Sequence, residues 1–131
     1  MSDGIPSGAS ALSGKRVLVV EDEFLIALDI QNILESAGAE VVLAYRVKDA
    51  LDTIHNNGPF EAALLDLKLD SETSLPIADQ LRADGVPFVF STGATGDTAI
   101  AARFQDVTIV AKPFGTETLV AALAAAMSTR H

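Results

Sequence analysis

The sequence predicts a single α/β domain with a doubly wound, five-stranded parallel sheet in the strand order 2-1-3-4-5, arranged in three layers. Two observations lead to this fold class. Five short apolar runs are typical of strands that are buried on both faces of a parallel sheet. A helical pattern follows each run, and this alternation implies right-handed crossovers with helices on both faces. The length of 131 residues suits one such domain.

The elements can be placed in order along the chain. The strands are expected at residues 16–21, 40–45, 61–66, 86–91 and 107–111. The helices are expected at residues 23–37, 47–56, 75–84, 97–105 and 116–128. The first helix has an apolar stripe that includes Ile26 and Ile30, and Gly38 is suited to end it. The fourth has the weakest pattern, because Ile100 and Phe104 are its only large apolar residues.

Composition narrows the classes of function. A net charge of −9 disfavours nucleic acid and anionic membranes as partners. The absence of cysteine excludes disulfides, zinc thiolates and a thiol nucleophile, and it fits a cytoplasmic location. No signal segment and no apolar stretch long enough to span a bilayer is visible. Residues 1–14 are rich in Ser and Gly, which predicts a disordered tail before a domain at 15–128.

Charged side chains follow three of the predicted strands. Glu21 and Asp22 end the first, Asp66 ends the third, and Lys112 follows the fifth. Because the carboxyl ends of parallel strands converge on one crevice, we expect these four side chains to meet there. Carboxylate oxygens are hard ligands that suit Mg²⁺, and a lysine can bind an anion carried by that metal. The sequence therefore predicts a phosphoryl site without a nucleotide loop.

The fourth strand adds two further candidates to this site. An aspartate accepts a phosphoryl group only if a metal and a lysine neutralise the charge, and a hydroxyl and backbone N–H groups hold the remaining oxygens. Thr92, at the end of the fourth strand, supplies a hydroxyl. Gly93 beside it allows the backbone to approach the phosphoryl group closely.

Four motifs, in this order and at five-strand spacing, resemble those of a response-regulator receiver domain over about residues 15–128. They are Val-Leu-Val-Val-Glu21-Asp22, Leu-Leu-Asp66, Phe-Ser-Thr92-Gly93 and Lys112-Pro113-Phe114. The resemblance implies the flavodoxin-like fold and a role in a two-component phosphorelay. It also implies a sensor histidine kinase or phosphotransfer protein as the donor. Output would be contact with a downstream protein partner, or drainage of phosphoryl groups from a kinase.

The resemblance further implies a role for each site residue. Asp66 would be the phosphoacceptor, Thr92 the switch hydroxyl and Lys112 the phosphoryl-binding lysine. The implied Mg²⁺ ligands are Glu21, Asp22, Asp66 and the backbone carbonyl of Lys68. Such a protein is a phosphoacceptor rather than an enzyme, with Mg²⁺-dependent self-phosphorylation and autodephosphorylation.

The chain departs from the usual family pattern at two positions. Asp70 stands where a proline commonly follows the phosphoacceptor, and Ile109 stands where an aromatic residue usually precedes the lysine. The segment from Phe90 to Gly93 is similar to the Phe-Ala-Thr-Gly motif of an atypical, single-domain branch from alphaproteobacteria. Because Ile109 cannot stack or hydrogen-bond as a tyrosine would, we expect the signal to travel through the loop at residues 92–98 and the weak helix after it.

Two alternatives remain open. A degenerate receiver could act only as an interaction scaffold, which fits Ile109 but not the intact set of acids, threonine and lysine. The segment from Thr92 to Gly96 also resembles the phosphate loops of short-chain dehydrogenases and flavodoxins, which would indicate a nucleotide or flavin binder. Such loops follow the first strand, however, and here the turn after the first strand is acidic and would repel a pyrophosphate.

Overall fold

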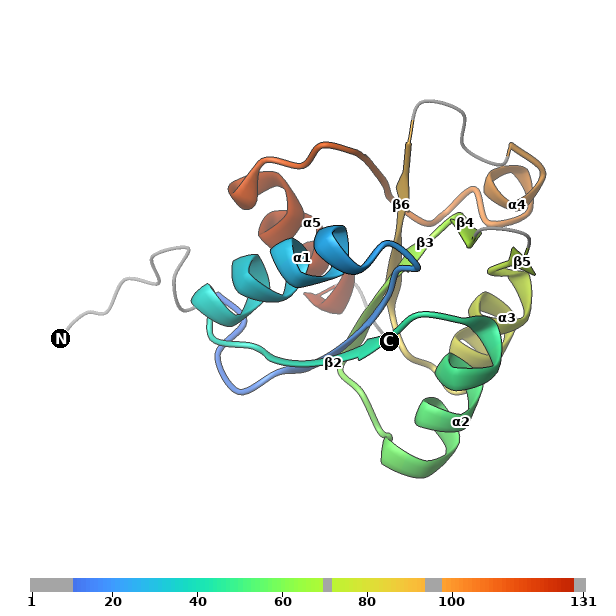
Figure 1. Cartoon of the computed structure of the whole chain (residues 1–131), viewed down its shortest axis with the longest axis horizontal. Helices are drawn as coiled ribbons and strands as arrows, with labels where there is room; N and C mark the ends of the chain where they lie inside the picture. The colour runs from blue at the N-terminus through green and yellow to red at the C-terminus, as the bar shows by residue number, and fades with distance from the viewer. Residues whose placement is uncertain (1–10, 70–71, 94–97, 129–131) are drawn as a thin grey trace, which may run out of the picture.

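A parallel sheet of five strands forms the middle of three layers in the computed structural model, which describes residues 11–69, 72–93 and 98–128 (Figure 1). The strand order is β2-β1-β3-β6-β7, so the predicted order 2-1-3-4-5 is confirmed for the main sheet. All neighbouring strands run parallel. The strands are β1 (Arg16–Val20), β2 (Glu40–Ala44), β3 (Ala62–Asp66), β6 (Phe88–Thr92) and β7 (Ile109–Ala111).

Helices cover both faces of the sheet. They are α1 (Phe24–Ser36), α2 (Val47–Asn57), α3 (Leu75–Ala83), α4 (Thr98–Arg103) and α5 (Thr116–Ser128). In Figure 1, α1 and α5 lie on one face, and α2, α3 and α4 lie on the other. The fourth helix has only six residues, in keeping with its weak apolar pattern. Among the described residues, none of the helices combines the length and apolar character that a membrane crossing requires.

The first strand shows why the sequence must be apolar on both sides. Leu18 and Val20 pack in the core beneath α2, α3 and α4, whereas Val17 and Val19 pack in the core beneath α1 and α5. Each of these side chains is at most 1% exposed. Full burial of one such side chain contributes roughly 1.5–3 kcal/mol. A polar residue would therefore be costly on either face, and charges are confined to the ends of the strand.

The register of the sheet aligns the ends of its strands. Val20 pairs with Leu65 across β1 and β3, and Thr92 pairs with Ala111 across β6 and β7. The residues that follow β1, β3, β6 and β7 therefore leave the sheet at one edge, as open α/β sheets require for a ligand crevice.

A second, two-stranded sheet was not predicted. It consists of β4 (Lys68–Leu69) and β5 (Glu72–Thr73), which pair antiparallel immediately after β3. Strands of two residues are too short to produce an alternating pattern, so periodicity could not reveal them. Asp70, one of the departures from the family pattern, lies outside the described residues.

The packed domain begins before the predicted boundary at residue 15. Residues 11–14 form a turn, in which Leu12 is fully buried and its N–H donates to the Ala37 carbonyl at 2.9 Å. Gly38 has a φ of +98°, and a Cβ there would lie 2.8 Å from the Cα of Ser13. Glycine therefore ends α1, as predicted, and also lets this turn approach. The rest of the predicted tail, residues 1–10, lies outside the described residues.

Candidate functional site

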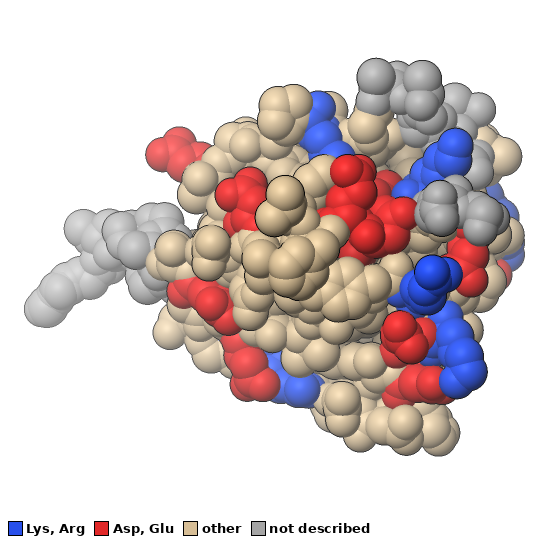
Figure 2. Space-filling view, in the orientation of Figure 1, with Lys and Arg blue, Asp and Glu red and all other residues tan. Residues whose placement is uncertain are grey.

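Three carboxylates meet at the carboxyl edge of the sheet. Glu21 and Asp22 follow β1, and Asp66 is the last residue of β3. One carboxylate oxygen from each residue lies within 4.8 Å of the other two. Glu21 is 1% exposed and Asp66 is 5% exposed, whereas Asp22 is half-buried. Acidic side chains gather near the middle of the face in Figure 2, beside the start of α1.

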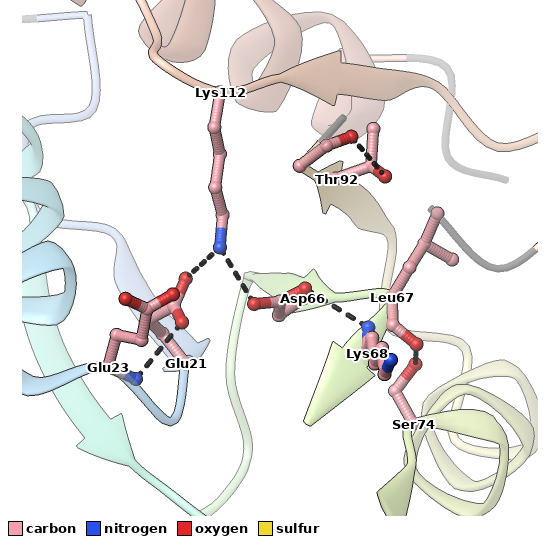
Figure 3. Close-up of polar contacts among 9 residues, drawn as sticks. Glu21, Glu23, Asp66, Leu67, Lys68, Ser74, Thr92 and Lys112 are labelled. Carbon is pink, nitrogen blue, oxygen red and sulfur yellow. Dashed lines mark hydrogen bonds and ion pairs between the residues drawn. The ribbon is translucent and has the colours of Figure 1, made fainter. Parts of the chain in front are cut away.

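Lys112 brings a positive charge between two of these carboxylates (Figure 3). Its Nζ lies 2.6 Å from Glu21 Oε1 and 2.7 Å from Asp66 Oδ2. The residue follows β7, and its backbone N–H donates to the Thr92 carbonyl at 2.8 Å, which fixes the base of the side chain. The peptide bond from Lys112 to Pro113 is cis. The structure thus places all four predicted charged residues in one cluster.

The surroundings of Glu21 raise the pKa of its carboxyl group. Its Oε2 accepts the backbone N–H of Glu23 at 3.1 Å. Its Oε1 is buried and, among the described residues, accepts no well-aligned hydrogen bond, so its contact with Lys112 is an ion pair. Burial raises the pKa of Glu21 to about 7, with the Asp66 charge acting in the same direction and Lys112 in the opposite one. Glu21 therefore exchanges a proton near neutral pH.

Burial has the opposite effect on the Lys112 ammonium, but the neighbouring carboxylates reverse it. Burial lowers the pKa of Lys112, but the hydrogen bond that its ammonium donates to Asp66, together with the charges of Asp66 and Glu21, outweighs this effect and leaves the pKa raised. The ammonium therefore stays charged at neutral pH. Its role in holding the two carboxylates does not depend on small changes in pH.

The donor set fits a hard divalent cation. Three carboxylates face a single ammonium, which leaves excess negative charge in the crevice. All the side-chain donors are oxygens, and the buried Glu21 Oε1 accepts no hydrogen bond among the described residues. These features match the preferences of Mg²⁺. Lys68 lies beside the cluster, because its N–H donates to Asp66 Oδ1 at 3.0 Å. Metal binding by the Lys68 carbonyl stays a prediction.

Thr92 and Gly93 lie at the same edge but are not joined to the charged cluster. The Thr92 hydroxyl donates to the Gly93 carbonyl at 3.1 Å, and among the described residues it makes no hydrogen bond to Asp66. Gly93 is exposed, and a Cβ there would meet nothing within 4 Å. Local packing therefore does not require glycine at this position. Residues 94–97 of the same loop lie outside the described residues.

Several supporting contacts were missed by sequence reasoning. The N–H groups of Glu23 and Lys68 hold the two buried carboxylates, but backbone donors leave no signal in a sequence. Ser74 is fully buried, and its Oγ donates at 3.3 Å to the carbonyl of Leu67, the residue after Asp66 (Figure 3). A serine before a helix usually suggests a cap. Here it instead ties the start of α3 to the residue after Asp66.

Comparisons with known proteins agree with the fold. Residues 17–124 match the family of the response regulator receiver domain. The solution structure of SdrG from Sphingomonas melonis Fr1 superposes with a TM-score of 0.76 at 37% identity, covering 91% of this chain and 98% of SdrG. The transcriptional regulatory protein DltR of Streptococcus agalactiae is 34% identical over 110 residues, covering 81% of this chain and 49% of DltR.

A further relative shares a smaller region. The sensor protein TorS of Escherichia coli is 36% identical over 73 residues, which cover 56% of this chain and 8% of TorS. The matched regions thus span about half of DltR and a small part of TorS. Since the family match covers most of the chain and the described sheet has the same topology, the chain belongs to the response regulator receiver domain family.

Proposed function

We propose that this receiver domain accepts a phosphoryl group on Asp66, with Mg²⁺, from a histidine kinase or phosphotransfer protein. One observation carries the proposal. The Asp66 carboxylate is buried at the end of a central strand, 2.7 Å from the Lys112 ammonium and beside Glu21 and Asp22. Such a carboxylate is positioned by the fold, and it can meet an anionic donor only where positive charge is also supplied.

The neighbours of Asp66 orient it for this reaction. The Lys68 N–H holds Oδ1 at 3.0 Å, and the Lys112 ammonium holds Oδ2 at 2.7 Å, so rotation of the carboxylate is restricted. In the transfer, one Asp66 oxygen forms a bond to phosphorus while the P–N bond of the donor breaks. The electron pair leaves with the imidazole of the donor. Lys112 then faces the new charge on the phosphoryl oxygens.

Charge neutralisation explains the acidic pair. Glu21, Asp22, Asp66 and the Lys68 carbonyl would hold Mg²⁺. The bound metal would offset the repulsion between the Asp66 carboxylate and the incoming phosphoryl group. The Thr92 hydroxyl donates to the Gly93 carbonyl in the structure, and after phosphorylation it would rotate to donate to a phosphoryl oxygen. This movement would couple phosphorylation to the loop after β6.

The signalling role follows from the class of domain. We place the protein in a cytoplasmic phosphorelay, within the single-domain branch that the Phe90–Gly93 motif supports, signalling by protein contacts or acting as a phosphate sink. The family match favours the two receiver hypotheses over a nucleotide or flavin binder. Between them, the intact charged cluster favours phosphotransfer over a passive scaffold.

Mass spectrometry tests the acceptor. The full chain is incubated with a small phosphodonor or a panel of phosphorylated histidine kinases, with Mg²⁺ or with EDTA. We expect one added phosphoryl group, only with Mg²⁺, and its loss in Asp66→Asn. Asp84→Asn, an exposed aspartate at the end of α3, is the matched control and should label like the parent. Undiminished labelling of Asp66→Asn would show that the acceptor lies elsewhere.

A further inference from the structure

The short β4–β5 pair connects Asp66 to the start of α2. Asp66 Oδ1 accepts the N–H of Lys68, the first residue of β4, at 3.0 Å. Lys68 pairs with Thr73, and Leu69 pairs with Glu72. The carboxylate of Glu72 in turn accepts the N–H of Val47, the first residue of α2, at 3.2 Å. A continuous series of contacts therefore runs from Asp66 to the start of α2.

Glu72 acts as the cap of α2 from a distant part of the chain. Arg46 occupies the N-cap position, and within the described part of the chain it makes no side-chain cap hydrogen bond. The first N–H groups of a helix need such partners, and a carboxylate there also interacts favourably with the helix dipole. The Glu72 carboxylate supplies both, so the position of β5 influences the first turn of α2.

Open space beside this connection allows it to move. A cavity of about 370 Å³ lies between the starts of α1 and α2 and the β4–β5 pair. Its lining residues are Asp22, Phe24, Tyr45, Arg46, Leu69 and Glu72. Leu69 anchors β4 in the core, whereas Lys68 and Thr73 are exposed. A small shift of the outer residues would thus change the cavity without opening the core.

We propose that phosphorylation of Asp66 is transmitted through β4 and β5 to the first turn of α2, with Glu72 as the coupling residue. This inference rests on the proposed function. When one Asp66 oxygen bonds to phosphorus and the donor departs with the electron pair of the broken bond, the other oxygen becomes a neutral carbonyl. Hydrogen bonds to a charged acceptor are roughly twice as strong as neutral ones. The hydrogen bond from the Lys68 N–H is therefore weakened, and Glu72 shifts with Lys68 through the paired strands.

This route leaves the site through contacts other than those of Thr92. Ile109 is 42% exposed on β7 and has neither a ring nor a hydroxyl to receive a movement of the Thr92 hydroxyl. The β4–β5 pair, by contrast, is already bonded to Asp66 before phosphorylation. The consequence is a second output surface at α2 and the adjoining cavity.

Amide exchange measured by NMR tests the connection on the full chain with Mg²⁺, before and after addition of beryllofluoride. We expect exchange at the Lys68 and Val47 amides to become about two- to tenfold faster, which corresponds to the weakening of one hydrogen bond. The Arg16 amide is an internal control, because it lies at the start of β1, at the opposite edge of the sheet, and donates to the Glu61 carboxylate at 2.6 Å. Its exchange should not change.

Two variants distinguish the transmission of the signal to α2 from the uptake of beryllofluoride at Asp66. Glu72→Ala should abolish the response of Val47 but keep that of Lys68 and the uptake of beryllofluoride. Glu61→Ala removes a carboxylate that also binds a backbone N–H, and the response of Val47 should survive in it. Tyr45, the only tyrosine in a chain without tryptophan, gives a fluorescence signal from the same cavity in the parent and both variants.

The outcomes distinguish the two proposals. If Lys68 responds in the parent but Val47 does not, the connection is disproved while the acceptor site stands. If neither amide responds and mass spectrometry finds no phosphoryl uptake, the proposed function fails, and the connection fails with it. The measurements on the parent decide the question even if Glu72→Ala does not fold.

Discussion

The two halves of the crevice differ in how firmly their side chains are held. On the β1–β3 side, Glu21 and Asp66 are buried and both contact the Lys112 ammonium (Figure 3). On the β6 side, Thr92 is only half-buried and its hydroxyl donates to the adjacent Gly93 carbonyl. Capture of a phosphoryl group requires charges that are fixed in advance, whereas a response to it requires groups that can move. The crevice separates these two requirements in space.

The largest effect on stability is expected when the Lys112 charge, which holds the carboxylates on the β1–β3 side of the crevice, is removed. Lys112→Ala leaves two buried carboxylates without their cation, and breaking a buried pair in this way costs about 3–5 kcal/mol. Protonation of Glu21 limits the loss, so we expect the free energy of unfolding in EDTA to fall by about 3 kcal/mol. Urea denaturation measures the change.

Lys48→Ala is the matched control for that experiment. Lys48 pairs with Asp52 on the exposed surface of α2, and such pairs contribute little. Its loss should therefore be well below that of Lys112→Ala. Equal losses in the two variants would mean that the ion pairs of the crevice are no stronger than those of the surface.

The second test uses pH in the absence of metal. The folded-state pKa of Glu21 is about 7, above its ordinary value of 4.5. Between these values the folded protein retains a proton that the unfolded chain loses, so stability falls as pH rises through this window. We expect the Glu21 contribution to fall by about 2–3 kcal/mol from pH 5 to pH 8 in EDTA.

Glu21→Gln should make this pH profile flatter, and excess Mg²⁺ should reduce or reverse the slope in the parent because the metal needs the ionised carboxylate. Thermal or denaturant melts at several pH values give both comparisons. A parent and a Glu21→Gln variant with the same slope would show that Glu21 ionises normally in the folded protein.

The third test distinguishes the carboxylates from one another. Two like charges within about 5 Å repel by about 3 kcal/mol at an effective dielectric near 20. Asp22→Asn should therefore raise the metal-free free energy of unfolding by about 1–2 kcal/mol, since this residue is partly solvated. Asp66→Asn relieves the same repulsion but gives up the 2.7 Å contact with Lys112, so its gain should be smaller.

Both variants should lose most of the stabilisation that Mg²⁺ gives the parent by mass action. Melts in EDTA and in excess Mg²⁺ provide the comparison. If both variants are less stable than the parent in EDTA, the three acids do not repel one another and the metal site as described is wrong.

The smallest effect is expected on the other half of the crevice. Thr92→Ala removes a hydrogen bond to the adjacent residue and should change stability by less than about 0.5 kcal/mol. Phosphoryl uptake should persist, whereas the slower hydrogen exchange that we expect at residues 98–104 with beryllofluoride should disappear. Unchanged exchange in the parent would remove the β6 side from the signalling route.

The sequence predicted those features that depend on long patterns. Short, continuous apolar runs identified every strand of the main sheet, although the edge strands β2 and β7 are partly exposed, and the order of the strands brought the four charged residues to one edge. It did not predict contacts made by single residues or by backbone. Leu12 stands alone among alanines, serines and glycines and is buried because the turn packs against the end of α1. Glu72 caps a helix that precedes it by 25 residues, which no local signal can show.

The turn at residues 11–14 has a practical consequence for handling the protein. It joins the domain at the end of α1, next to the amino edge of the sheet, whereas the charged crevice lies at the carboxyl edge. A linker attached at residue 11 would hold the domain on a bead or sensor chip with the crevice directed into solution. A fragment trimmed to begin at residue 15 would lack the buried Leu12 side chain, and it would be a poorer reagent for any such binding assay.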